Sequence, residues 1–110
     1  CASETIDGRY YSSSGGQNDF ARGAMYSNGG QGFVVLHSTT SSGASKIVPQ
    51  LAAGDVVTTP KNTVDKVVTE HGVAELRHAT VRERTRRLIA IAHPDHREQL
   101  TAQAHEMHYL

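Results

Sequence analysis

The sequence predicts an α/β fold, as a single domain or part of one, in which short strands form a sheet with flanking helices. Its 110 residues leave room for one domain and not for two. Short apolar runs bounded by Gly, Pro and Asn occur in the first two thirds and are typical of strands. Apolar residues with helical spacing become regular only after Thr80. The strands should therefore precede the main helices.

The first predicted element is a short helix over residues 19–26, which follows a polar segment rich in Ser and Gly. Asn18 or Asp19 is expected to cap it, because a side-chain oxygen there can accept the free N–H groups of the first turn. The inner face of this helix is expected to consist of Phe20, Ala24 and Met25.

Three apolar runs predict strands. The run Phe33–Leu36 contains no polar residue, which favours a strand buried on both faces. Further strands are expected at Val56–Thr59 and Val67–Thr69, each bounded by turn residues. The segment Val73–Leu76 is interpreted as one helical turn.

Two helices are predicted near the end. Thr80 and Glu83 have the spacing of a capping box, in which each side chain accepts a backbone N–H of the other residue. This predicts a helix over residues 81–93. Asp95 is expected to cap a second helix over residues 95–107, since Pro94 suits a helix start. The apolar stripe of that second helix would be Leu100, Ala104 and Met107.

Composition excludes several classes of function. Lys and Arg number 11 and so do Asp and Glu, and this neutral balance argues against a general nucleic-acid binder. No apolar run approaches the roughly 20 residues that span a bilayer, so no membrane partner is expected. One Cys and no visible signal peptide favour a cytoplasmic protein. His105 and His108 are three apart rather than the four of a zinc helix motif, so no metal site is expected.

Two local features carry possible chemistry. Gly15 and Gly16 precede the first helix, where they either make a simple turn or expose backbone N–H groups to an anion or oxyanion. Glu70 follows the strand Val67–Thr69. A carboxylate at the end of a parallel strand often borders a ligand crevice, although a turn or an ion pair explains it equally well.

An ordered series of motifs makes the chain recognisable. It runs from GGQNDFARGA at residues 15–24 through SKIVP at 45–49 and VVTEHGVAELR at 67–77 to IAHPD at 91–95. This series resembles the C-terminal domain of the acetyl-CoA hydrolase/transferase family, which includes 4-hydroxybutyrate, butyryl, succinyl and acetate CoA-transferases. The resemblance implies a CoA-transferase-like α/β fold for the whole chain, 1–110.

The resemblance also implies a reaction in which a glutamate attacks an acyl-CoA thioester and CoA passes between carboxylates. The family's nucleophilic glutamate lies upstream of the Gly-Gly segment, so the isolated chain is expected to be inactive. Gly16 matches the position whose backbone N–H resembles an oxyanion-hole donor, and Gly15 is the second choice. Glu70 matches a glutamate near the active-site crevice. Acyl-CoA, a carboxylate and the upstream catalytic domain are the implied partners.

Four further residues are implied to contact the coenzyme A thioester: Gln17, Ser38, Thr39 and Lys46. Many relatives carry a lysine near CoA in the loop after the first strand. Residues 38–43 contain none, and Lys46 just beyond them is the candidate substitute. Strands that are apolar on both faces also predict a homo-oligomer. The alternative function is a non-catalytic interaction or structural module derived from this domain.

Overall fold

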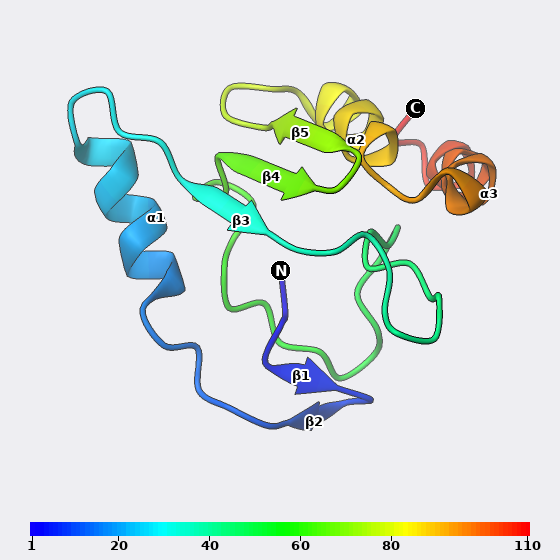
Figure 1. Cartoon of the computed structure of the whole chain (residues 1–110), viewed down its shortest axis with the longest axis horizontal. Coiled ribbons are helices and arrows are strands. Elements are labelled where there is room, and N and C mark those ends of the chain that lie inside the picture. Colours follow the sequence, from blue (N-terminus) through cyan, green and yellow to red (C-terminus); the bar gives the residue numbers. More distant parts are fainter.

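The computed structural model describes every residue from Cys1 to Leu110 and confirms the α/β class. It contains two small sheets and three helices (Figure 1). None of these helices combines the length and the apolar character that crossing a membrane requires. In chain order the elements are β1 (Thr5–Ile6), β2 (Arg9–Tyr10), α1 (Gln17–Tyr26), β3 (Phe33–Val35), β4 (Lys66–Thr69), β5 (Gly72–Glu75), α2 (Val81–Ala90) and α3 (Pro94–Glu106).

The central sheet has the order β3-β4-β5 and mixes two kinds of pairing. β3 lies parallel to β4, and β4 turns back into antiparallel β5 (Figure 1). The helical turn predicted at residues 73–76 is therefore wrong. Val73 and Glu75 are exposed whereas Ala74 and Leu76 are buried, which is the two-residue period of a strand. Gly72 permits the reversal, since its φ of +138° suits glycine alone.

The apolar core lies between the inner face of this sheet and helix α2. Its buried centre consists of Val67, Ala74, Leu76 and Ile91, with Val34, Leu36, Ile47, Val64 and Leu88 packed against it. The outer face of the sheet is open, because Phe33 is 56%, Val35 74% and Val73 54% exposed. The prediction that the first apolar run is buried on both faces is thus wrong for these 110 residues, which supply only one covering layer.

The strand predicted at Val56–Thr59 does not form. Instead of pairing with a strand, Thr58 and Thr59 donate their N–H groups to the carbonyl of Cys1, at 3.1 and 3.4 Å. Val56 and Val57 are exposed. High β-propensity marks residues that fit a pleated surface, but here no neighbouring strand is available to pair with them.

Both C-terminal helices are confirmed. The capping box at α2 is formed, with the Glu83 N–H donating to Thr80 Oγ1 at 3.3 Å and the Thr80 N–H donating to Glu83 Oε2 at 2.7 Å. The cap of α3 is not Asp95, as predicted, but His93, whose Nδ1 accepts the Asp95 N–H at 3.3 Å. Leu100 and Ala104 are buried as expected.

Helix α1 is confirmed as an element but is unusual in its packing. It begins at Gln17 after Gly16, and no side chain caps it, so the predicted Asn18 or Asp19 cap is wrong. None of its residues is buried, and Phe20 is 83% exposed. Of the predicted inner face, Phe20 and Met25 are exposed and only Ala24 is half-buried, against the loop that contains Gly30 and Gly32. Figure 1 shows α1 standing beyond β3, on the side away from β4.

Candidate functional site

Glu70 and Ser38 meet at one end of the sheet. Because β3 and β4 are parallel, their carboxyl ends share an edge, and Ser38 and Glu70 each follow one of them. The Ser38 N–H donates to Glu70 Oε2 at 2.9 Å, and Ser38 Oγ donates to Oε1 at 2.6 Å. These bonds, above all the one from the Ser38 hydroxyl, lower the pKa of Glu70 to about 2. The expected position of Glu70 at a parallel strand end is confirmed.

The loop after Ser38 holds the other predicted contacts. Thr39 pairs with Ser45, and the Lys46 N–H donates to the Ser38 carbonyl at 2.8 Å. Ser38 is fully buried and its hydroxyl is occupied by Glu70, so its effect on any ligand would pass through that carboxylate. Lys46 is exposed and forms no ion pair, which leaves its ammonium group free for an anion. The CoA contacts themselves stay predictions.

A row of imidazoles continues from Glu70, and no spacing along the chain predicted it. His71 Nε2 lies 3.7 Å from Glu70 Oε1, and the His71 ring meets the His93 ring edge-on at 5.5 Å between centroids. His96 follows at 6.0 Å from His93, and its Nε2 lies 2.8 Å from the Gly43 carbonyl. The segment between α2 and α3 lies against the end of β4, where Thr69 Oγ1 donates to the Ile91 carbonyl at 2.6 Å, and this brings His93 at the start of α3 beside His71. No group of three side chains in the chain has metal-binding geometry.

The glycine pair forms the start of α1. Gly15 has a φ of +59°, and Gly16 is the residue that caps the helix. The N–H groups of residues 16–19 have no acceptor within the chain. A Cβ on Gly15 would meet no atom within 4 Å, so the backbone there is open to approach. Unpaired N–H groups at a helix start favour a negatively charged ligand group.

The two parts of the predicted site do not touch. No hydrogen bond or ion pair joins residues 15–17 to Glu70 or Ser38. Gln17 instead donates from Nε2 to Cys1 Sγ at 3.4 Å. Figure 1 shows the start of α1 and the β4–β5 turn apart from each other. These 110 residues therefore present two half-sites that do not form one closed pocket.

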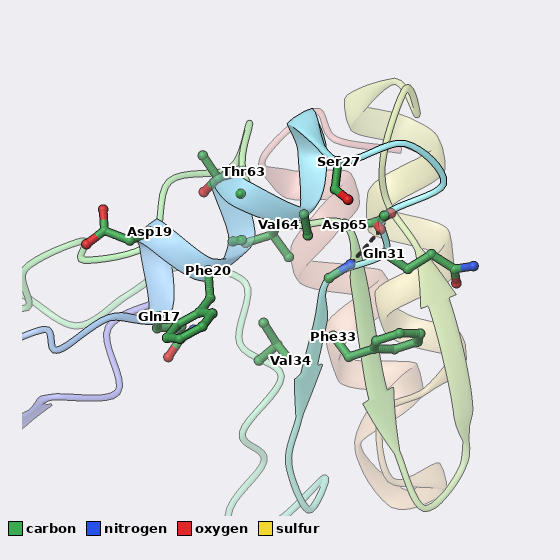
Figure 2. Close-up of a pocket in the computed structure, with 15 residues that line it drawn as sticks. Gln17, Asp19, Phe20, Ser27, Gln31, Phe33, Val34, Thr63, Val64 and Asp65 are labelled. Carbon is green, nitrogen blue, oxygen red and sulfur yellow. Dashed lines mark hydrogen bonds between the residues drawn. The ribbon is translucent and has the colours of Figure 1, made fainter.

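A groove of about 660 Å³ separates α1 from β3 (Figure 2). Asp65 lies at one end of the groove and holds the loop that precedes β3, because its Oδ2 accepts the Gly32 N–H at 3.0 Å. Arg77 Nη2 lies 3.3 Å from the same oxygen. Burial favours a raised pKa for Asp65, but the bonds from Gly32 and Lys66 and the charge of Arg77 lower it overall. Sequence reasoning missed Asp65, because an Asp before a Lys is typical of a surface pair.

Known proteins resemble the chain in sequence and in structure. The sequence pattern of the acetyl-CoA hydrolase/transferase C-terminal domain matches residues 1–104. The succinyl-CoA:cyclohexane-1-carboxylate CoA transferase of Geobacter metallireducens is 55% identical over 108 residues, which is 97% of this chain and 25% of that protein. The 4-hydroxybutyrate coenzyme A transferase of Clostridium kluyveri is 50% identical over 99 residues, 89% of this chain and 23% of that protein.

The solved structure of RipA from Yersinia pestis superposes with a TM-score of 0.90 and 42% identity, over 100% of this chain and 25% of that one. The chain thus spans about a quarter of the length of the relatives it matches. The expected CoA-transferase-like fold is confirmed by this superposition and by one on a 4-hydroxybutyrate CoA-transferase of Porphyromonas gingivalis, with a TM-score of 0.72 and 46% identity over 84% of this chain and 22% of that one. Sequence and structure agree that the chain belongs to the acetyl-CoA hydrolase/transferase family and carries its C-terminal domain.

Proposed function

We propose that this chain is the C-terminal part of a CoA-transferase or acyl-CoA hydrolase and supplies an oxyanion hole together with part of the CoA and acyl pocket. The observation that carries this proposal is the start of α1. There, bare glycine backbone leads into N–H groups that the chain itself leaves without acceptors. The relatives named for CoA transfer support the same chemistry.

The proposed role of these N–H groups follows from the charge that develops during thioester cleavage. When a nucleophile adds to the thioester carbonyl, the oxygen becomes negative, and preorganised N–H donors stabilise it more than they stabilise the ground state. Gly16 is the proposed donor and Gly15 the second candidate. Because the pair precedes a helix, the partial positive charge of the helix start adds to the effect.

The nucleophile is proposed to be a glutamate in the preceding part of the longer protein. Within this chain, Glu4 is buried and accepts the Thr58 hydroxyl at 2.6 Å, so it cannot reach a substrate in this arrangement. Glu70, with a pKa of about 2, is a weak base near neutral pH. Its proposed role is to accept hydrogen bonds at the edge of the pocket. The isolated chain should then show no turnover, because covalent catalysis is lost without its nucleophile.

The test uses the full-length protein and two variants of one glycine. Gly16→Pro removes the N–H, whereas Gly16→Ala retains it and places a methyl group 3.3 Å from the Phe20 ring, which can move aside. The proline variant should lose roughly 10²–10³ in kcat, with little change in CoA binding. The alanine variant should keep most of its activity. Near-normal kcat in Gly16→Pro would place the donor elsewhere, with Gly15 next.

The alternative, a non-catalytic interaction module, is favoured by the separation of the two half-sites within the chain. A CoA-exchange assay of the full-length protein with a panel of carboxylic acids separates the two functions. Exchange between a carboxylate and acyl-CoA supports a transferase, and release of free CoA without an acceptor acid supports a hydrolase. A folded full-length protein that does neither would support the module.

A further inference from the structure

Strand β3 has one paired edge and one free edge. On the paired side, the Gly32 carbonyl accepts the Lys66 N–H and the Leu36 N–H donates to the Val68 carbonyl, both at 3.0 Å. Alternate residues of a parallel strand face the same neighbour. The intervening residues, Phe33 and Val35, therefore direct their N–H and C=O groups away from β4, where no group of this chain bonds to them.

The groove between α1 and β3 runs along this free edge. Phe33 and Val34 both line it, although successive side chains of a strand point to opposite faces. A groove that both residues line must follow the edge of the strand rather than lie over one face. Figure 2 shows Phe20 of α1 and Val34 on the two walls. The unpaired backbone of β3 is thus open to another chain segment.

The surroundings of this edge are apolar and lack a partner. Phe33 and Val35 are more than half exposed, and Phe20 across the groove is 83% exposed. An unpaired, exposed, apolar edge is a template for strand addition, which stable proteins avoid or cover. Helix α1 has 10 residues and none buried, and helices of that length are marginal in water unless they pack. A chain segment lying in the groove would pair with the free edge of β3 and would also give α1 a surface to pack against.

We propose that a β-strand from the preceding part of the full-length polypeptide lies in this groove and pairs with the free edge of β3. Relatives of this family are about four times as long as this chain, which spans 25% of two of them, so a full-length protein of their size would supply ample chain for such a strand. The added strand gains backbone bonds from Phe33 and Val35. Its apolar side chains cover Phe20 on the wall formed by α1. The proposal does not depend on thioester chemistry.

Hydrogen exchange of the full-length protein tests the pairing directly. The amides of Val34 and Leu36 should be protected in any case, since they face β4. The proposed strand should protect Phe33 and Val35 to a similar degree, within about tenfold. Exchange of Phe33 and Val35 at the rate of unbonded loop amides would overturn the proposal. Protection that grows with protein concentration would overturn it too, since it would identify a second copy as the occupant.

Proline substitution in the same full-length protein gives a matched pair. Val35→Pro removes an N–H that the proposal places in a ladder, whereas a free edge tolerates proline. Val73→Pro is the control. The backbone groups of Val68 bond to β3, so Val68 and its antiparallel neighbour Val73 form no hydrogen bonds with each other. The N–H of Val73 therefore points to the outer edge of β5. Val35→Pro should lower the urea midpoint clearly more than Val73→Pro. Equal small shifts, together with unprotected Phe33, would show that the edge is free.

Discussion

The two halves of the chain are held together in different ways. All seven buried apolar residues lie between Val67 and Ala104, in the central sheet, in α3 and in the segments that directly follow β5 and α2. The buried residues before Lys66 are all polar: Glu4, Ser38, Thr59, Thr63 and Asp65. The first half is instead tied to itself by hydrogen bonds, such as Thr58 Oγ1 to Glu4 at 2.6 Å and Thr5 Oγ1 to Asp55 at 2.8 Å.

This difference separates a region with its own core from one that depends on its surroundings. A fully buried aliphatic side chain contributes about 1.5–3 kcal/mol, whereas an intramolecular hydrogen bond contributes a net 0.5–1.5 kcal/mol or so. The second half can therefore fold around its core. The first half carries the glycine pair and the groove, and its helix α1 has no buried residue, so it has no apolar core of its own.

The largest expected effect is in the core of the second half. Leu76→Ala should lower the free energy of unfolding by about 2–5 kcal/mol, because Leu76 is fully buried and its loss leaves a cavity. Urea unfolding of the 110-residue chain measures this. Leu51→Ala, at a position in the first half that is 36% exposed, is the control and should cost less. Equal losses would mean that the first half has a comparable core.

A second prediction concerns Ser38, which joins the two halves through Glu70. Ser38→Ala removes the hydroxyl donor but keeps the N–H bond, so the pKa of Glu70 should rise from about 2 part of the way toward its ordinary 4.5. NMR titration of the Glu70 carboxyl measures this. An unchanged pKa would show that the hydroxyl does not hold the carboxylate.

The same bond predicts how stability depends on pH. The pKa of Glu70 is lower in the folded than in the unfolded chain, so its contribution is complete above about pH 4.5 and lost as the pH falls toward 2. Ser38→Ala should flatten the stability curve in that window. His71→Gln, which leaves both Ser38 bonds intact, is the control and should retain most of the slope.

A smaller effect is expected at the start of α2. Thr80→Ala removes the hydroxyl that accepts the Glu83 N–H and should cost about 0.5–2 kcal/mol of unfolding free energy. Thr85→Ala in the same helix is the control. Its hydroxyl bonds only to the Val81 carbonyl within the helix, so alanine there should be neutral or slightly stabilising. A Thr80→Ala variant as stable as the control would show that the cap contributes nothing.

The sequence predicted best what local signals determine. The capping box and Pro94 located α2 and α3, and the end of a parallel strand located Glu70. The sequence-based prediction failed where the conformation of a segment depends on a partner that is far away along the chain. The strand expected at residues 56–59 is absent, and the helical turn expected at 73–76 is a strand, because only the second segment has a neighbouring strand. The His71–His93 contact arises from helix packing, and no spacing along the chain indicates it.

The smallest expected effect in the 110-residue chain is at Phe20, whereas the same substitution should have a large effect in the longer protein. Phe20 is 83% exposed here, so Phe20→Ala should change the free energy of unfolding by no more than about 0.5 kcal/mol. If a strand fills the groove in the full-length protein, the ring becomes buried, and the same substitution should cost about 3–5 kcal/mol there. Tyr26→Ala is the control. It lies on the same helix, is 81% exposed and does not line the groove, so we expect little effect in either protein. A small effect of Phe20→Ala in both would mean that the groove stays open, and that α1 keeps its exposed position in the assembled protein.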